Sequence, residues 1–208
     1  MHTVIELIKE LKEEGISHPL VLEAIKHVPR ENFMEQSLKK SAYVNTAFPI
    51  ACQQTISQPY IVALMTQALL ENTINPEKIL EIGTGSGYQA AILAMLFKTV
   101  YTVERIPALY QKAKIILDKL GFENIFYKLG DGAQGWEEHA PYDGIIVTAA
   151  AKVAPPKLLA QLKPEGGVMV IPLGEQHKTQ ILYLVVRQGN NFIPSVLTHV
   201  RFVPLIEN

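Results

Sequence analysis

The sequence has a single cysteine, Cys52, among its 208 residues, so no disulfide can form within the chain. A reducing compartment is the simplest home for such a protein, and we expect it to be cytoplasmic. The N-terminus lacks a basic region followed by an apolar run, and no window reaches the length of a membrane span, so we expect no membrane partner. Cys52 is as compatible with a small packed residue as with a reactive thiol.

An excess of charge of either sign is also missing, since the formal net charge is −1. This balance argues against a broad nucleic-acid surface, and we expect no nucleic-acid partner. The six histidines are scattered without the spacing of metal ligands, so we predict no metal site. The hydrophobic content of 48% is ample for a substantial core, and we expect one structural domain that works as a monomer.

The chain is organised around the stretch from Lys78 to Tyr88, which reads KILEIGTGSGY. Ile79, Leu80 and Ile82 form a short apolar run that is typical of a central parallel strand covered on both faces. Apolar residues at helical spacing follow the glycines, so the segment predicts a strand, a turn and a helix. Such a turn at the carboxyl end of a strand in an open α/β sheet is where nucleotide-like ligands bind.

Gly83, Gly85 and Gly87 alternate in this turn. Glycine permits positive φ and lets a ligand approach the backbone closely, although a tight connection also uses glycine for geometry alone. We interpret three alternating glycines as more than a turn requires, which favours a ligand. Glu104 lies 21 positions after Gly83, at the end of the next predicted strand. There its carboxylate is placed to accept hydrogen bonds from a ribose diol, the alternative being a surface carboxylate.

The remaining pattern predicts an α/β fold. Thr3 and Glu6 form a capping box for a helix that Gly15 ends, and Pro19 opens a second helix. Strands are expected at residues 100–104, 125–129, 142–147 and 166–171, helices at 107–120 and 155–162, and an antiparallel pair at 180–186 and 192–203. This order predicts a three-layer α/β/α sandwich. We expect a helical and active-site-loop extension, residues 1–75, packed on a core of residues 76–208.

Residues 41–59 lack a clear period and mix small polar with apolar residues, which is typical of a loop that carries function. Ser57 precedes the apolar pattern of residues 61–69, so we predict that it is the N-cap of a helix. A capping serine can also face a ligand. Asp131 stands in a second tight turn, where it either pairs with an adenine amino group or stabilises the turn.

The glycine spacing separates two cofactor classes. A dinucleotide fingerprint reads G-x-G-x-x-G, whereas this chain has G-x-G-x-G with Glu81 two places before the first glycine. The form E-x-G-x-G-x-G resembles the first motif of class I S-adenosylmethionine-dependent methyltransferases, with Glu104 in the place of their ribose-binding acid. An NAD-dependent oxidoreductase and a non-catalytic binding module of the same fold are the alternatives from other classes.

Further blocks make the resemblance narrower, because in this order they are similar to the compact bacterial form of the protein-L-isoaspartate O-methyltransferase family. The blocks are VPRENF at 28–33, QTISQP at 54–59, LEIGTGSGYQA at 80–90, VERI at 103–106, GDG at 130–132, APYD at 140–143, IIVTA at 145–149, QL at 161–162 and RFVPL at 201–205. TISQP and RFVPL are much more specific than the glycine motif. The sequence departs from the family at Ala51-Cys52-Gln53, where bacterial relatives commonly carry Gly-Gln-Gly, and this bears on loop flexibility and substrate approach.

The resemblance implies a Rossmann-like methyltransferase fold, S-adenosylmethionine as cofactor, and isoaspartyl-containing proteins and peptides as substrates. The reaction would methylate the free α-carboxylate of L-isoaspartyl residues, and more weakly the β-carboxylate of D-aspartyl residues, after which the ester cyclises to a succinimide and repair begins. Ser57 stands at the family's active-site serine position. The cofactor-binding candidates are Thr55, Gln58, Glu81, Gly83, Thr84, Gly85, Ser86, Gly87, Glu104, Arg105, Asp131 and Gly132. A class I methyltransferase for another acceptor, a small molecule or RNA, is the remaining alternative.

Overall fold

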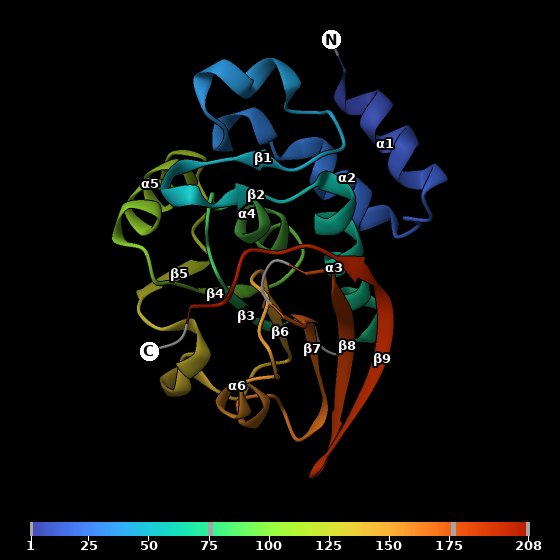
Figure 1. The fold of residues 1–208 in the computed structure, drawn as a ribbon, viewed down its shortest axis with the longest axis vertical. Coiled ribbons are helices and arrows are strands. Elements are labelled where there is room, and N and C mark those ends of the chain that lie inside the picture. The colour runs from blue at the N-terminus through green and yellow to red at the C-terminus, as the bar shows by residue number, and fades with distance from the viewer. Residues whose placement is uncertain (1, 75–76, 176–177, 207–208) are drawn as a thin grey trace.

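The protein is described here by a computed structural model that covers residues 2–74, 77–175 and 178–206 (Figure 1). Its main-sheet strands are β3 (Lys78–Ile82), β4 (Thr99–Glu104), β5 (Ile125–Leu129), β6 (Gly144–Val147), β7 (Glu165–Leu173), β8 (Gln180–Gln188) and β9 (Asn191–Val200). The strands β1 (Phe48–Pro49) and β2 (Thr55–Ile56) form a separate antiparallel pair. The α-helices are α1 (Val4–Glu13), α2 (Pro19–His27), α3 (Pro59–Asn72), α4 (Tyr88–Ala94), α5 (Pro107–Lys119) and α6 (Pro156–Ala160). Short 3-10 helices are η1 (Arg30–Phe33), η2 (Gln36–Ser41), η3 (Ala51–Gln53), η4 (Gly132–Gln134) and η5 (Glu137–His139).

The seven strands of the main sheet lie in the order β5-β4-β3-β6-β7-β8-β9. The strands from β5 to β7 are parallel, and β8 and β9 continue the sheet in antiparallel fashion. The predicted antiparallel closing pair is therefore confirmed. Strands β4 and β5 extend the sheet on one side of β3, whereas β6 and β7 extend it on the other. This reversal makes the carboxyl end of β3 a topological switch point, where open α/β sheets bind ligands.

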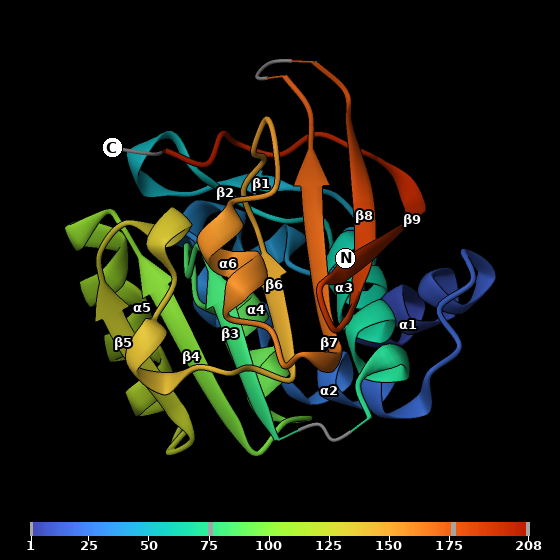
Figure 2. The same cartoon turned by 90° about the horizontal axis from the view of Figure 1, so that it is seen from below.

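Side chains of the central strands alternate between two hydrophobic clusters, one on each face of the sheet. Ile79 and Ile146 belong to the cluster that packs against α3 and α4, whereas Leu80 and Ile145 belong to the cluster on the side of α6. Figure 2 shows α6 on the face opposite α3. Both faces are thus covered by helices, which explains why these strands carry apolar residues at successive positions. The predicted α/β/α sandwich is confirmed.

The N-terminal helices pack onto the same core. Thr3 and Glu6 form the predicted capping box, in which the Glu6 N–H donates to Thr3 Oγ1 at 3.3 Å and the Thr3 N–H donates to the Glu6 carboxylate at 2.7 Å. Leu7 and Leu11 of α1 are fully buried in the hydrophobic cluster that also contains Ile79 of β3. The predicted boundary between residues 75 and 76 lies outside the described residues.

Two sequence expectations concern features that are absent from the described ranges. No helix within residues 2–74, 77–175 or 178–206 combines the length and the apolar character needed to cross a bilayer. The same ranges contain no group of three or more His, Cys, Asp or Glu side chains arranged to hold a metal ion.

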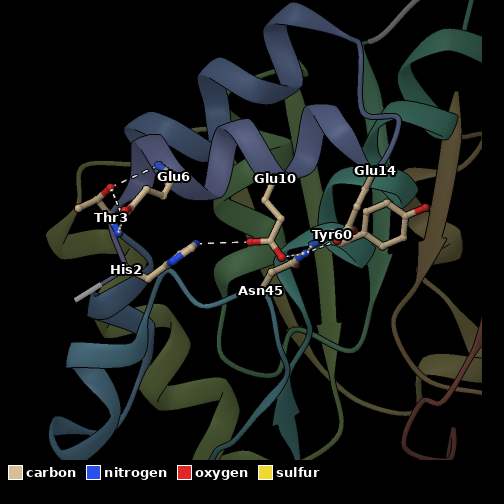
Figure 3. Close-up of polar contacts among 7 residues, drawn as sticks. All are labelled: His2, Thr3, Glu6, Glu10, Glu14, Asn45 and Tyr60. Carbon is tan, nitrogen blue, oxygen red and sulfur yellow. Dashed lines mark hydrogen bonds and ion pairs between the residues drawn. The ribbon is translucent and has the colours of Figure 1, made fainter.

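The start of α3 differs from the prediction, because Gln58 and not Ser57 is the N-cap residue. Pro59 occupies the first helical position, where a missing N–H needs no partner. The next N–H, that of Tyr60, donates at 2.9 Å to the side-chain oxygen of Asn45, which comes from the preceding loop (Figure 3). A capping oxygen is therefore supplied by a residue 15 positions away. The Ser57 hydroxyl is left without a capping role.

Asn45 also ties α1 to this helix terminus. Its Nδ2 donates to Glu10 Oε1 at 3.2 Å and to Glu14 Oε1 at 3.0 Å (Figure 3). His2 Nε2 lies 3.4 Å from the second carboxylate oxygen of Glu10. One amide side chain thus joins the first helix, the loop before β1 and the N-terminus of α3.

Replacing Asn45 by alanine should lower the free energy of unfolding by about 1–2 kcal/mol, because the α3 terminus loses its capping oxygen and α1 loses its link to the loop. Ser57→Ala should change it by less than about 0.5 kcal/mol, since Ser57 does not cap the helix. Urea denaturation followed by circular dichroism measures both. A larger loss for Ser57→Ala than for Asn45→Ala would reject the capping assignment.

Candidate functional site

The glycine turn after β3 has a backbone that other residues rarely adopt. The φ angles of Gly83, Gly85 and Gly87 are 92°, 55° and 90°, all in the left-handed region. A Cβ atom on Gly83 would also lie 2.5 Å from Oγ1 of Thr148. Positive φ favours glycine at all three positions, and Gly83 has no room for a side chain, so the number of glycines does not by itself indicate a ligand. The case for a ligand rests on the surrounding cavity and not on the glycine count.

Two side chains hold this turn in place. The Glu104 carboxylate, at the end of β4, accepts the N–H of Gly85 through Oε2 and the N–H of Ile106 through Oε1, both at 2.8 Å. The Thr148 hydroxyl, just after β6, donates to the carbonyl oxygens of Ile82 at 3.0 Å and Gly83 at 2.7 Å. The ends of β3, β4 and β6 are thereby joined at the switch point.

A cavity of about 850 Å³, including its open mouth, lies over this junction. It lies at the switch point, where open α/β sheets bind ligands. The predicted site residues that line it are Thr55, Ser57, Gly83, Thr84, Gly85, Ser86, Glu104, Arg105 and Gly132. Glu104 is only 5% exposed, so its carboxylate faces the cavity in a largely dehydrated setting. Hydrogen bonds to a carboxylate in such a site are strong.

Four predicted cofactor residues lie outside the lining of this cavity. Gly87 is the N-cap of α4, and Gln58 lines a neighbouring hollow. Asp131 Oδ1 accepts the N–H of Ala133 at 3.0 Å and so stabilises its own turn. Glu81 is completely buried on β3, directly beneath the turn.

Glu81 is an unusual buried carboxyl group. Burial raises its pKa to about 8, against the lowering effect of the Thr102 hydroxyl, which donates to Oε2 at 2.5 Å. Its other oxygen, Oε1, has no hydrogen-bond partner among the described residues. A buried carboxyl group with a free oxygen beside a ligand cavity fits a ligand that carries a positive charge, because a nearby cation would favour the ionised form.

The remaining walls of the cavity come from two segments that are distant from each other in the sequence. Residues 54–57 approach from the N-terminal part and residues 203–206 from the C-terminal segment. The Ala150 N–H donates to the Val203 carbonyl and the Leu205 N–H to the Ala150 carbonyl, both at 2.8 Å, while Arg105 donates to the Ile206 carbonyl at 3.1 Å. The C-terminal segment is thus docked on the loop after β6.

A second hollow, of about 770 Å³ with its mouth, adjoins the first. Thr55 and Ser57 line both. The other walls of the second hollow include the start of α3, the end of β9 with His199, and the segment after β9 with Arg201. Ser57 therefore lines both the cavity at the glycine turn and the adjoining hollow.

Several lining residues were not among the sequence-based candidates, notably Thr148 and Tyr88. Thr148 carries no signal of its own, because a threonine after a buried strand is equally typical of close packing. Tyr88 follows the glycine turn and reads as the first apolar residue of a helix. Only the proximity of β3, β6 and α4 in the folded chain identifies them.

The loop before Thr55 contains two non-glycine residues in left-handed conformation. Cys52 has a φ of 59° and Gln53 a φ of 57°, and both are exposed. Ala51 is not among the residues with positive φ. Left-handed backbone costs a residue with a side chain roughly 1–2 kcal/mol relative to the right-handed form. The departure from Gly-Gln-Gly therefore places strain at Gln53.

Comparison with known proteins gives consistent matches. The model of the protein-L-isoaspartate(D-aspartate) O-methyltransferase family matches residues 2–208. A protein-L-isoaspartate O-methyltransferase of Shewanella sp. (strain MR-4) is 52% identical over 204 residues, which cover 98% of this chain and 94% of the relative. The enzyme of that name from Dictyoglomus thermophilum is 54% identical over 200 residues, which cover 96% of this chain and 89% of the relative.

Two solved structures share the fold over nearly the whole chain. One is a protein-L-isoaspartate O-methyltransferase, with a TM-score of 0.88 and 28% sequence identity. The matched region covers 99% of this chain and 67% of the chain in that structure. A structure from Plasmodium falciparum, described as a protein of the same activity in complex with S-adenosyl-L-homocysteine, has a TM-score of 0.85 at 26% identity and covers 100% of both chains.

Gln53→Gly should leave the melting temperature equal to or above that of the wild type. It relieves left-handed strain, which offsets the roughly 0.4–1 kcal/mol of extra chain entropy that glycine brings to the unfolded state. Ala51→Gly is the matched control and should lower the stability by about 0.5–1 kcal/mol, because no strain is relieved there. Differential scanning calorimetry compares them. Equal losses in the two variants would show that Gln53 is not strained.

Proposed function

Because the chain belongs to the protein-L-isoaspartate(D-aspartate) O-methyltransferase family, we propose that it transfers a methyl group from S-adenosylmethionine to the free α-carboxylate of L-isoaspartyl residues in damaged proteins. The observation that carries this proposal is the position of Ser57. It stands between the cavity at the glycine turn and the adjoining hollow, in a chain that matches the family over residues 2–208. One hollow suits the methyl donor and the other suits a peptide acceptor.

The residues around the first cavity fit the cofactor. Glu104 would accept hydrogen bonds from the ribose hydroxyls, and the turn from Gly83 to Gly87 lets the ligand approach the backbone. Glu81, whose pKa burial raises to about 8, lies beneath the turn with an unpaired oxygen and would become ionised beside a cationic group. When bound, the cofactor supplies an activated methyl group carried on a positively charged sulfur.

The chemistry asks little of the protein beyond positioning. A carboxyl group with a pKa near about 4 is already ionised at neutral pH, so no general base is needed. A carboxylate oxygen provides the electron pair of the new C–O bond while the methyl–sulfur bond breaks, and no proton moves. The protein aligns the two reactants and partly removes water from them. We propose that Ser57 orients the acceptor by hydrogen bonding and is not a nucleophile.

We further propose that the protein acts as a cytoplasmic monomer without nucleic-acid or membrane partners. The near-neutral charge and the single cysteine support this. We also propose that residues 1–75 are an extension of the single methyltransferase domain, supported by the burial of Leu7 and Ile79 in one cluster. A sedimentation coefficient of a dimer at micromolar concentration would contradict the monomer.

Methyl transfer to isoaspartate can be measured directly. The protein is incubated with methyl-labelled S-adenosylmethionine and a matched pair of peptides that differ only in an isoaspartyl or aspartyl linkage. We expect base-labile methyl ester on the isoaspartyl peptide alone, because only that linkage presents a free α-carboxylate. Equal labelling of both peptides, or of neither, would reject the proposal and favour a methyltransferase for a small molecule or RNA.

Glu104→Gln should weaken binding of S-adenosylhomocysteine by about ten- to a hundredfold, the range expected for losing hydrogen bonds to a charged group. The KM for the isoaspartyl peptide should change far less. Ser57→Ala should show the reverse, a higher KM or lower kcat for the peptide with cofactor affinity kept. Isothermal calorimetry and initial rates give these values, and a thermal melt checks that Glu104→Gln remains folded. If Glu104→Gln impaired the peptide and Ser57→Ala impaired cofactor binding, both assignments would be rejected.

A further inference from the structure

Arg30 is a buried cation behind the acceptor side of the site. It begins η1 and its side chain has no exposed surface. Nη1 donates to the Ser57 carbonyl at 2.8 Å, and Nη2 donates to the Thr46 carbonyl at 3.3 Å. Its Cζ lies 5.1 Å from the centroid of the Tyr88 ring. The guanidinium group therefore touches two residues, Ser57 and Tyr88, that line the cofactor cavity.

No carboxylate neutralises this charge within the described residues. Arg30 forms no ion pair there, and its Nε has no hydrogen-bond partner. The adjacent Glu31 carboxylate instead accepts the Tyr43 hydroxyl at 2.6 Å. Burial lowers the pKa of Arg30 to about 10, so the group remains a cation at neutral pH. A buried charge without a partner is costly to the fold, and a counter-charge that binds nearby recovers part of that cost.

The contacts of the Arg30 guanidinium indicate where a negatively charged ligand group could bind near it. The guanidinium contacts Ser57, which lines both hollows, and Tyr88, which lines the cavity at the glycine turn. An acceptor carboxylate that binds beside Ser57 would bring a negative charge to this side of the guanidinium. The methyl ester formed in the reaction is neutral and would lose this attraction.

We propose that Arg30 is a positioning residue for the acceptor: it holds the Ser57 segment through the Ser57 carbonyl, and its unneutralised charge favours the ionised carboxylate over the neutral ester. This inference rests on the proposed function. Arg30 thereby promotes binding of the substrate and release of the product. Its two effects, geometry and charge, can be measured separately.

The test compares an isoaspartyl peptide with an analogue that carries an α-carboxamide in place of the α-carboxylate. The analogue keeps the shape and removes the charge. In the wild-type protein we expect its inhibition constant to exceed the KM of the isoaspartyl peptide by about tenfold or more, the order expected for a charge pair near a partly buried site. A ratio near one would overturn the proposal without any variant.

Arg30→Met removes the charge and keeps a long side chain. We expect the KM of the isoaspartyl peptide to rise about tenfold more than the inhibition constant of the carboxamide, whose change reports the lost Ser57 contact alone, while the Kd of S-adenosylhomocysteine stays within about twofold. Arg30→Lys keeps the charge and should retain most of the discrimination between the two peptides. If Arg30→Met does not fold, Arg30→Gln removes the charge in the same comparison, and a wild-type ratio near one would overturn the proposal in any case.

Arg187 provides a matched control, because it also binds carbonyl groups. Its Nη1 donates to the Ala160 carbonyl at 3.1 Å and to the Leu162 carbonyl at 2.7 Å, on β8 and away from the site. Arg187→Met should leave the discrimination between the two peptides unchanged. Equal weakening of both peptides in Arg30→Met would show a purely structural role and overturn the charge assignment. Failure of the wild-type protein to methylate any isoaspartyl peptide would instead reject the proposed function itself.

Discussion

The Glu104 carboxylate and the Thr148 hydroxyl join three parallel strands at the point where the strand order reverses, and the remaining features of the site are built on that junction. Glu104 accepts the N–H of Gly85, while Thr148 donates to the carbonyl of Gly83. A turn made of left-handed glycines has few favourable contacts of its own, so these bonds define its shape. Glu104 has both a structural and a ligand-binding reason to be a carboxylate, since each of its oxygens retains a lone pair for further donors.

The N-terminal part of the chain supports the opposite wall by a different device. Asn45 supplies the capping oxygen at α3, and the guanidinium of Arg30 binds the Ser57 carbonyl. Both contacts join segments distant in sequence, and both act on the backbone of residues 57–60. The hydroxyl is therefore held in position without being used as a structural partner. Such support from a second layer of residues is what keeps a binding geometry rigid.

Two buried ionisable groups, one acidic and one basic, flank the site. Glu81 lies beneath the glycine turn with one unpaired oxygen, and Arg30 lies behind Ser57 with an unpaired Nε. In methyl transfer from a sulfonium to a carboxylate, the reactants are oppositely charged and the sulfur and ester of the products are neutral. Under our proposals each buried charge favours one reactant over its product. The arrangement would promote both the binding of substrates and the release of products.

The sequence alone determined the strand–turn–helix unit, the parallel sheet with its antiparallel end, and the acid at Glu104, because these depend on local periodicity, glycine conformation and spacing. Family membership also followed from the ordered blocks along the chain. The sequence did not predict the cap of α3, because the Tyr60 N–H donates a hydrogen bond to Asn45, which lies 15 residues earlier in the chain. Nor did it reveal Thr148 at Gly83 or Arg30 behind Ser57. These contacts were decided by the tertiary structure, because side chains distant in sequence meet only after the sheet and its helices have packed.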